Sequence, residues 1–291
     1  MSHPRAARGD RTDVVARPLL TPGEVRALLE SHGLAPRKAL GQHFVVDANT
    51  LRKVVRAAGI GPGDLVCEVG PGLGSLTLAL RQAGARVVAL EIDEGLVRAL
   101  ADVVGDDPQV RVVRGDALVA DLAGLVGGGP AALVSNLPYN VATPVVLRAL
   151  EAGAFDRLLV VVQRDVGRRW ASGVGDRLYG AVSVKLAALA DVTVVSAVSR
   201  NAFYPVPNVD SVMVRLLARR WVLPVGRAAL FAVVQTGFSQ RRKRLRNALA
   251  SPGRPPAAVE RALTECGLDP AARAEELDLE AWAALAARLG S

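Results

Sequence analysis

The turn Glu68-Val69-Gly70-Pro71-Gly72-Leu73-Gly74-Ser75 joins a short β-branched run, Leu65–Val69, to a helical stretch. Glycines at such a strand-to-helix turn let the backbone pass close to a bound ligand. A tight turn without a ligand is the alternative interpretation, and the strand-to-helix context disfavours it. We therefore expect a nucleotide-type binding site on an α/β fold.

Further β-branched runs follow the turn and alternate with helical stretches, which is typical of a βαβ series. Continuous apolar strands of this kind are buried on both faces in a parallel sheet covered by helices. Two more runs could pair with each other at an edge of this sheet. The pattern predicts a Rossmann-like α/β domain with a mostly parallel seven-stranded sheet, with strands near residues 65–69, 86–90, 110–113, 132–134, 158–162, 192–198 and 209–217.

Two acidic residues come at the ends of later strands. Glu91 stands 21 residues beyond Gly70, where a carboxylate can accept hydrogen bonds from both hydroxyls of a ribose, and Asp116 follows the third strand, within reach of an adenine edge. Either acid alone could equally be a solvated turn residue. A nicotinamide-dependent dehydrogenase would space its glycines G-x-G-x-x-G, whereas this turn reads G-x-G-x-G. The spacing favours S-adenosylmethionine as the ligand.

The tetrapeptide Asn136-Leu137-Pro138-Tyr139 ends the fourth expected strand, at the edge where open α/β sheets bind ligands. The Asn136 side-chain oxygen and the Pro138 carbonyl could both accept from the exocyclic amine of adenine and turn its lone pair toward a methyl donor. Tyr139 could stack on the base, and Phe203 is a candidate second stacking face for an extruded base. The alternatives are a plain Asn-Pro turn and, for Phe203, a core position.

A net charge of +8 favours a polyanionic partner, although basic proteins without one are common. We expect a patch formed by Arg241, Arg242, Lys243, Arg244 and Arg246, on a helix whose apolar side includes Val234, Phe238, Leu245 and Leu249. An ordinary solvated helix surface is the alternative. Other basic residues that could extend the patch are Arg37, Lys38, Arg164, Arg168, Arg169 and Arg177.

The composition, with 51% hydrophobic and 22% charged residues, indicates a globular chain without a membrane span. Only Cys67 and Cys266 could form a disulfide, which favours a reducing cytoplasm. His43 lacks the neighbouring ligands of a known metal motif, so we expect no metal. We predict a flexible leader over residues 1–20, an S-adenosylmethionine-dependent methyltransferase domain over 21–222 and a helical RNA-binding domain over 223–291.

These motifs resemble the ribosomal RNA adenine dimethyltransferases, specifically the branch that modifies 16S RNA of the bacterial small subunit. The resemblance spans roughly residues 37–289. It rests on the glycine turn, on Asn136 to Tyr139, and on the segments 37–44, 203–211 and 238–243.

The resemblance implies dimethylation of two adjacent adenosines near the 3′ end of 16S rRNA in a late precursor of the small subunit, and we expect a monomer. Many relatives carry Asn where His43 stands and Leu where Val45 stands. A macrolide-resistance type enzyme for 23S rRNA and a non-catalytic assembly or transcription factor remain as alternatives. The residues implied as cofactor contacts are His43, Val45, Gly70, Glu91, Asp116 and Asn136, to which the glycine turn adds Gly72.

Overall fold

The computed structural model describes residues 17–37 and 41–290, and its largest element is a seven-stranded sheet in the order β4-β3-β2-β5-β6-β9-β7. The pairs from β4 to β6 are parallel, whereas β9 runs antiparallel to both β6 and β7. The predicted Rossmann-like sheet is confirmed, and so is the pair at its edge. The strands are β2 (Leu65–Val69), β3 (Arg86–Glu91), β4 (Val110–Arg114), β5 (Ala131–Asn136), β6 (Phe155–Gln163), β7 (Ala190–Val198) and β9 (Ser211–Ala218).

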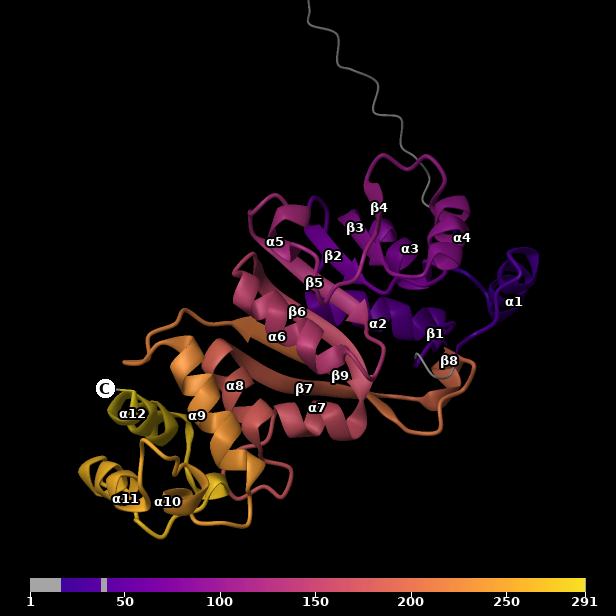
Figure 1. Ribbon diagram of the computed structural model, residues 1–291. Helices are drawn as coiled ribbons and strands as arrows, with labels where there is room; N and C mark the ends of the chain where they lie inside the picture. Colours follow the sequence, from indigo (N-terminus) through magenta and orange to yellow (C-terminus); the bar gives the residue numbers. More distant parts are fainter. Residues whose placement is uncertain (1–16, 38–40, 291) are drawn as a thin grey trace, which may run out of the picture.

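The order of the strands reverses at β2, which lies between β3 and β5. From β2 the chain builds outward to β3 and β4 on one side, and then returns to place β5 and β6 on the other side (Figure 1). In open α/β sheets the crevice outside the carboxyl ends of the strands at such a reversal binds ligands. The glycine turn follows β2, so it lies at this crevice.

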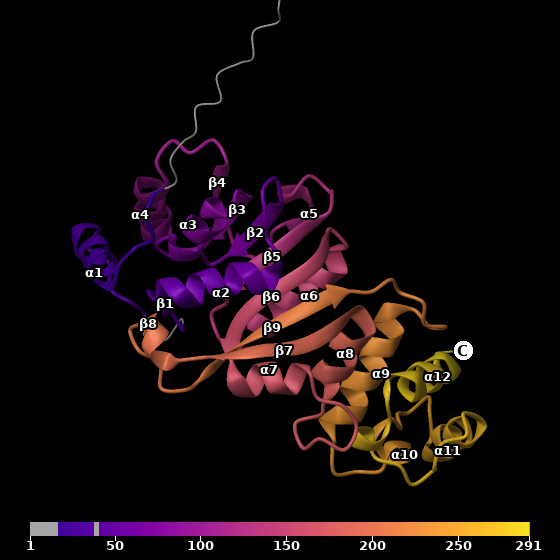
Figure 2. The same cartoon turned by 180° about the vertical axis from the view of Figure 1, so that it is seen from behind.

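Helices cover both faces of the sheet (Figure 2), because successive residues of each buried strand point to opposite faces. Val160 of β6 packs in a core with α5, α6, α7 and α8, whereas the next residue, Val161, packs in a core with α2, α3 and α4. The helices are α2 (Ala48–Ala58), α3 (Ser75–Gln82), α4 (Glu94–Val104), α5 (Leu122–Leu125), α6 (Ala142–Ala152), α7 (Arg164–Trp170) and α8 (Ala181–Leu189).

The N-terminal part begins with α1 (Pro22–Ser31), whose capping box joins Thr21 and Glu24. The prediction of a flexible leader over residues 1–20 is wrong for its last residues. Leu20 is only 2% exposed, and Arg17 donates to the carbonyl of Val103. Residues 1–16 of that leader lie outside the described part of the chain. A second, two-stranded antiparallel sheet pairs β1 (Phe44–Val45) with β8 (Phe203–Tyr204), which follows the short helix η2 (Arg200–Ala202).

The C-terminal helices gather around the fully buried Trp282. Their core includes Val184 and Ala188 of α8, so one helix contributes to both this core and the core beneath the sheet. The domain boundary after residue 222 stays a prediction. The elements of this part are α9 (Arg227–Ser239), α10 (Leu245–Ala248), α11 (Pro256–Glu265), η3 (Ala274–Glu276) and α12 (Leu279–Leu289). Among the described residues, no helix combines the length and apolarity needed to cross a membrane.

Candidate active site

A cavity of about 200 Å³ opens at the carboxyl ends of β2, β3 and β5. Residues from five separate segments of the chain meet in its walls, because parallel strands present their carboxyl ends at one edge of the sheet. Pro138 lines the cavity. So do all seven residues predicted as cofactor contacts, which are His43, Val45, Gly70, Gly72, Glu91, Asp116 and Asn136.

Gly72 is required at its position in the turn by backbone conformation and by space. Its φ angle of +58° lies in the left-handed region, which L side chains rarely adopt. A Cβ atom there would lie 2.7 Å from Cε1 of Phe44 in β1. The turn therefore packs directly against the segment that forms the opposite wall of the cavity.

Glu91, at the end of β3, presents a carboxylate that three backbone amides already bind. Its Oε2 accepts from Gly72 N at 3.1 Å, and its Oε1 accepts from Ile92 N at 2.9 Å and Asp93 N at 3.0 Å. Burial raises the pKa of this carboxyl, and the three hydrogen bonds partly oppose that effect. A carboxylate has about four acceptor positions, so one remains for a ligand hydroxyl.

Asp116 follows β4 and is half-buried. Its Oδ1 accepts from Leu118 N at 2.8 Å, which fixes the turn after the strand. Its Oδ2 has no hydrogen-bond partner among the described residues. An adenine edge could use this oxygen as an acceptor.

Two buried polar side chains beside the glycine turn add to the fit for a polar ligand. The hydroxyl of Ser75, at the start of α3, lines the cavity and has no hydrogen-bond partner among the described residues. Glu68 is 1% exposed, accepts from the Thr77 hydroxyl at 2.6 Å, and has its pKa raised to about 8 by burial. The cavity thus fits S-adenosylmethionine, with Glu91 available for a ribose hydroxyl, Asp116 for the adenine edge and Ser75 for a further polar group.

Asn136 ends β5 and its side-chain amide is held by the opposite wall. Its Nδ2 donates to the backbone carbonyl of His43 at 2.7 Å. Because the nitrogen is engaged, Oδ1 remains as the acceptor that the amide offers to a substrate. Pro138 also lines the cavity, and its carbonyl accepts from Val141 N at 3.2 Å, which leaves one lone pair.

His43 connects three of the motif segments. Its Nδ1 lies 2.7 Å from the carbonyl oxygen of Pro205, and since a carbonyl only accepts, this nitrogen carries the proton and donates. Its ring centroid lies 5.6 Å from that of Tyr139, at an angle of 31°. The Tyr139 hydroxyl in turn is 2.9 Å from Ser211 Oγ, and burial raises its pKa. Tyr139 therefore contacts His43 but does not itself line the cavity.

Phe203 does not lie where the predicted stacking role requires. Its side chain is 2% exposed and packs in the core with α2 and α3, and it pairs with Val45 across the small sheet. Its ring offers no open face to a base in this structure. The physical reason is the pairing of β1 with β8, which turns this aromatic residue inward.

The predicted basic helix is also corrected. The helix α9 ends at Ser239, so residues 241–244 form a turn before α10. Arg241 pairs with Glu275 at 2.6 Å and Arg246 with Glu260 at 3.2 Å. The remaining three of the patch are exposed: Arg242, Lys243 and Arg244.

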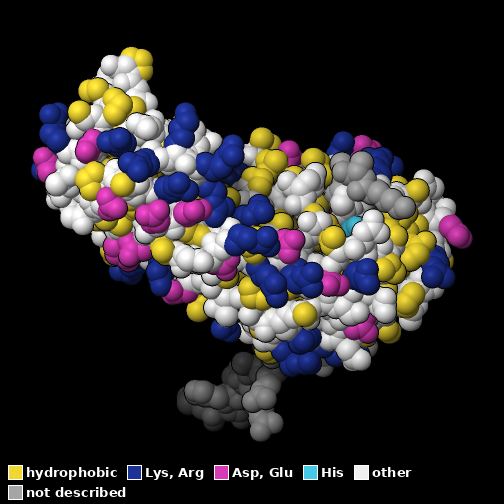
Figure 3. All heavy atoms as spheres, turned by 90° about the horizontal axis from the view of Figure 1, so that it is seen from below, with side chains coloured by type: hydrophobic (Ala, Val, Ile, Leu, Met, Phe, Trp, Pro, Cys, Tyr) yellow, Lys and Arg dark blue, Asp and Glu magenta, His cyan; other side chains and the backbone are white. Residues whose placement is uncertain are grey.

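Figure 3 shows basic side chains in a broken band that runs from the lobe of C-terminal helices across to the sheet domain. Arg168 and Arg169 of α7 and Arg177 of the loop after it are also exposed, and the carbonyl of Arg177 accepts from Arg241 at 3.1 Å. Arg164 instead pairs with Asp210 at 2.9 Å, and Arg37 pairs with Asp93 at 3.1 Å. Lys38 lies outside the described residues.

Several residues that line the cavity had no role predicted from the sequence. Glu68 and Ser75 belong to the glycine turn, and Gln42 belongs to the segment before His43. Each therefore lies in a motif that the sequence shows, but the sequence did not indicate that its side chain lines the cavity. For Ile92, the only sequence signal of a place in the cavity wall is its position next to Glu91. Across residues 17–37 and 41–290, no three His, Cys, Asp or Glu side chains gather as a metal site would require.

Comparison with known proteins extends over nearly the whole chain. Ribosomal RNA small subunit methyltransferase A of Thermobifida fusca is 48% identical over 277 residues, which cover 92% of this chain and 95% of that protein. The protein of the same name from Nocardia farcinica is 47% identical over 294 residues, with 97% of each chain covered.

Solved structures share the fold. The 23S rRNA methyltransferase ErmE is 29% identical with a TM-score of 0.64, and the match covers 85% of this chain and 100% of that one. A dimethyladenosine transferase from Plasmodium falciparum is 23% identical with a TM-score of 0.67, and the match covers 84% of this chain and 96% of that one. At this identity the likeness supports the fold alone. The family model for ribosomal RNA adenine dimethylase matches residues 33–290. The chain therefore belongs to the ribosomal RNA adenine dimethylase family, whose methyl donor is S-adenosylmethionine.

Proposed function

We propose that the chain methylates N6 of two adjacent adenosines near the 3′ end of 16S rRNA, within a precursor of the small ribosomal subunit. The observation that carries the proposal is the side-chain amide of Asn136, at the tip of β5. The nitrogen of this amide donates to the carbonyl of His43, so the oxygen of the amide is left to accept from the adenine amine. The relatives at 48% and 47% identity, both named for the small subunit, support the choice of RNA.

S-adenosylmethionine supplies a methyl group on a sulfonium, which is electrophilic without further activation. The exocyclic amine of adenine is a poor nucleophile because its lone pair is delocalised into the ring. Acceptance of its protons by Asn136 Oδ1 and the Pro138 carbonyl would turn that lone pair out of the ring plane. Correct orientation of two reactants can contribute up to roughly 7 to 11 kcal/mol to lowering a barrier.

No general base is needed in this scheme, because the amine becomes strongly acidic as its new carbon–nitrogen bond forms. Its proton can pass to water. For stacking on the base we favour Tyr139 over Phe203, since Tyr139 lies three residues after Asn136 and is only half-buried, whereas the Phe203 ring is buried.

RNA binding in this proposal uses exposed arginines and one lysine of α7, of the loop after it and of the turn before α10, and Figure 3 shows that basic side chains are numerous on this face. Arginine suits phosphate because its donors form a planar fork. The turn formed by residues 241–244 and α7 would then contact the RNA backbone together, since Arg241 of the turn donates to the carbonyl of Arg177 in the loop after α7. The protein would act as a monomer in the cytoplasm, where subunits mature. The residues are Arg242, Lys243, Arg244, Arg168, Arg169 and Arg177.

Methylation of 23S rRNA is the second candidate, because ErmE shares the fold at 29% identity. The test supplies labelled S-adenosylmethionine with unmodified small subunits, large subunits or free RNA and locates the label. We expect label in small subunits. Label confined to large subunits would refute the proposed substrate and favour the second candidate.

A further inference from the structure

We propose that Arg37 is a positioning residue for the cofactor site: its ion pair with Asp93 holds together two walls of the cavity, one from residues 41–45 and one from residues 91–93. The inference rests on the proposed reaction only in that S-adenosylmethionine is the ligand of the cavity. It replaces the role in RNA binding that the sequence predicted for Arg37.

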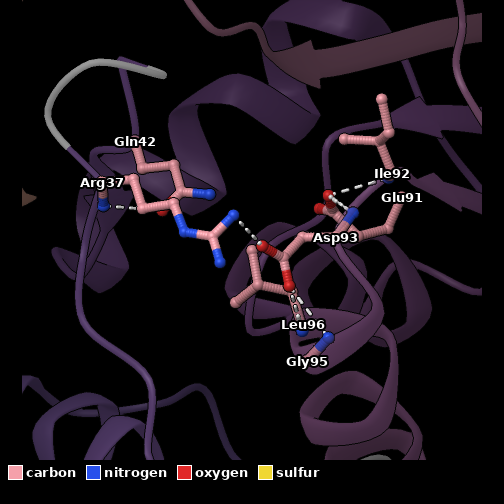
Figure 4. A network of polar contacts seen from close by, with 7 residues as sticks. All are labelled: Arg37, Gln42, Glu91, Ile92, Asp93, Gly95 and Leu96. Atoms are coloured by element: carbon pink, nitrogen blue, oxygen red, sulfur yellow. Dashed lines mark hydrogen bonds and ion pairs between the residues drawn. The ribbon is translucent and has the colours of Figure 1, made fainter.

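On one side of the pair, Asp93 is held by its helix and by the site. Its Oδ1 accepts from Gly95 N at 2.8 Å and from Leu96 N at 3.2 Å, and so caps α4. Its backbone N–H donates to Oε1 of Glu91, the carboxylate in the cavity. Its Oδ2 lies 3.1 Å from Nη1 of Arg37, and its side chain is 11% exposed (Figure 4).

On the other side, the backbone of Arg37 is bound to Gln42 in both directions. The N–H of Arg37 donates to Oε1 of Gln42 at 2.8 Å, and the N–H of Gln42 donates to the carbonyl of Arg37 at 3.4 Å. Gln42 lines the cavity and immediately precedes His43, whose carbonyl holds Asn136. The guanidinium of Arg37 thus reaches across from this wall to the loop that carries Glu91, as Figure 4 shows.

The charge of Asp93 gives the pair a second consequence. Asp93 is one of the groups that raise the pKa of Glu91, although burial is the larger cause. A guanidinium on Asp93 offsets its negative charge beside the Glu91 carboxylate. A phosphate contact by Arg37 would require the guanidinium to share or leave this carboxylate, so binding of the two anions would compete.

The two roles for Arg37 predict different results. If Arg37 positions the cofactor wall, Arg37→Gln raises the Kd for S-adenosylmethionine about fivefold, the factor that corresponds to about 1 kcal/mol for a partly exposed pair. The kcat at saturating S-adenosylmethionine and the Kd for RNA then stay within about twofold. If Arg37 contacts phosphate, the same variant weakens RNA binding and lowers its salt slope by about 1.

Asp93→Asn separates the roles further, because Asn keeps the helix cap while the charge is lost. The positioning role predicts the same rise in Kd for S-adenosylmethionine as Arg37→Gln, and the double variant is no weaker than either single one because both remove one interaction. The phosphate role predicts tighter RNA binding, since Arg37 would be released.

Arg98→Gln is the matched control, because Arg98 pairs with Glu94 on α4 and its side chain is 65% exposed, close to the 63% of Arg37. The Arg98→Gln variant should bind S-adenosylmethionine with the Kd of the wild type. The Arg37→Lys variant keeps the positive charge, so it should retain most of the affinity that Arg37→Gln loses. Binding is measured by calorimetry on the full chain, after equal thermal unfolding midpoints show that each variant folds.

The outcomes also separate this inference from the proposed function. A wild-type protein that binds S-adenosylmethionine, together with an Arg37→Gln variant no weaker than Arg98→Gln, overturns the positioning role alone. A wild-type protein that binds no S-adenosylmethionine overturns the proposed reaction, and the positioning role with it. A selective rise in Kd for Arg37→Gln and Asp93→Asn, with RNA affinity unchanged, establishes the inference.

Discussion

The side-chain amide nitrogen of Asn136 donates a hydrogen bond of 2.7 Å to the backbone carbonyl of His43. The two residues come from opposite walls of the cavity, one from the tip of β5 and one from the residue before β1. This contact decides which end of the amide is left for a substrate, and it makes Asn136 an acceptor in the proposed chemistry.

Replacement of Asn136 by Ala should lower kcat at least about a hundredfold, a typical cost for removal of one positioned polar group that acts on the reacting atoms. The Kd for RNA should change less than about twofold, because the residue lies in the cavity and away from the basic turn. Single-turnover kinetics with saturating RNA and S-adenosylmethionine measures the first value, and a filter-binding titration measures the second. Wild-type turnover in this variant would refute the orienting role.

Glu68→Gln should make stability less dependent on pH. Burial raises the pKa of Glu68 from the ordinary 4.5 to about 8 in the folded protein. Between these two values the unfolded chain has lost the proton while the folded chain keeps it, so the contribution of Glu68 to stability is largest below about 4.5 and is lost as the pH rises toward 8.

The amide of a glutamine at position 68 can still accept from Thr77 and carries no titrating proton. Thermal unfolding of both proteins across this pH range should therefore show the variant gaining on the wild type as the pH rises. A difference in melting temperature that stays constant with pH would show that Glu68 does not titrate in this way.

Gly72→Ala should be much more harmful than Gly59→Ala, although both glycines have a left-handed φ, +58° and +63°. A Cβ at Gly59 meets no atom within 4 Å, so this control measures only the backbone cost of about 1 to 2 kcal/mol. A Cβ at Gly72 also collides with Phe44, and overpacking adds roughly 1 to 3 kcal/mol. Urea unfolding compares the two, and equal losses would mean that the turn and β1 are not in close contact.

Arg242→Gln should weaken RNA binding and reduce its salt slope by about 1, because an exposed arginine loses one phosphate contact. Arg241→Gln is the control, since Arg241 pairs with Glu275 and also donates to the carbonyl of Arg177. It should leave the slope unchanged and lower stability by no more than about 1 kcal/mol. An equal effect of both variants on the slope would place Arg241 on the RNA as well.

The strands and the cavity wall were open to sequence reasoning because their signals are local. A β-branched run such as Leu65–Val69 forms a strand at its predicted position, and the glycine turn marks where that strand meets the crevice. Glu91 and Asp116 were recognisable as well, because the ends of parallel strands converge at one edge.

The rest depends on partners that are distant in the sequence. Arg241 and Glu275 are 34 residues apart, and Arg246 and Glu260 are 14 apart, so no periodicity reveals that these pairs form. Phe203 is drawn into the core by its pairing with Val45, which is 158 positions earlier in the chain. A prediction from charge alone therefore assigned paired arginines to RNA binding, and a prediction from aromaticity alone assigned a buried phenylalanine to base stacking.

The proposal depends most on transfer of methyl groups to the exocyclic amine of adenine in small-subunit RNA. Nucleoside mass spectrometry of 16S rRNA, digested after unmodified small subunits have been incubated with the protein and S-adenosylmethionine, tests this most directly. We predict N6,N6-dimethyladenosine at two adjacent positions near the 3′ end. Methyl groups on a ring carbon, a ribose or another base, or unmodified adenosines at both positions, would contradict the proposal.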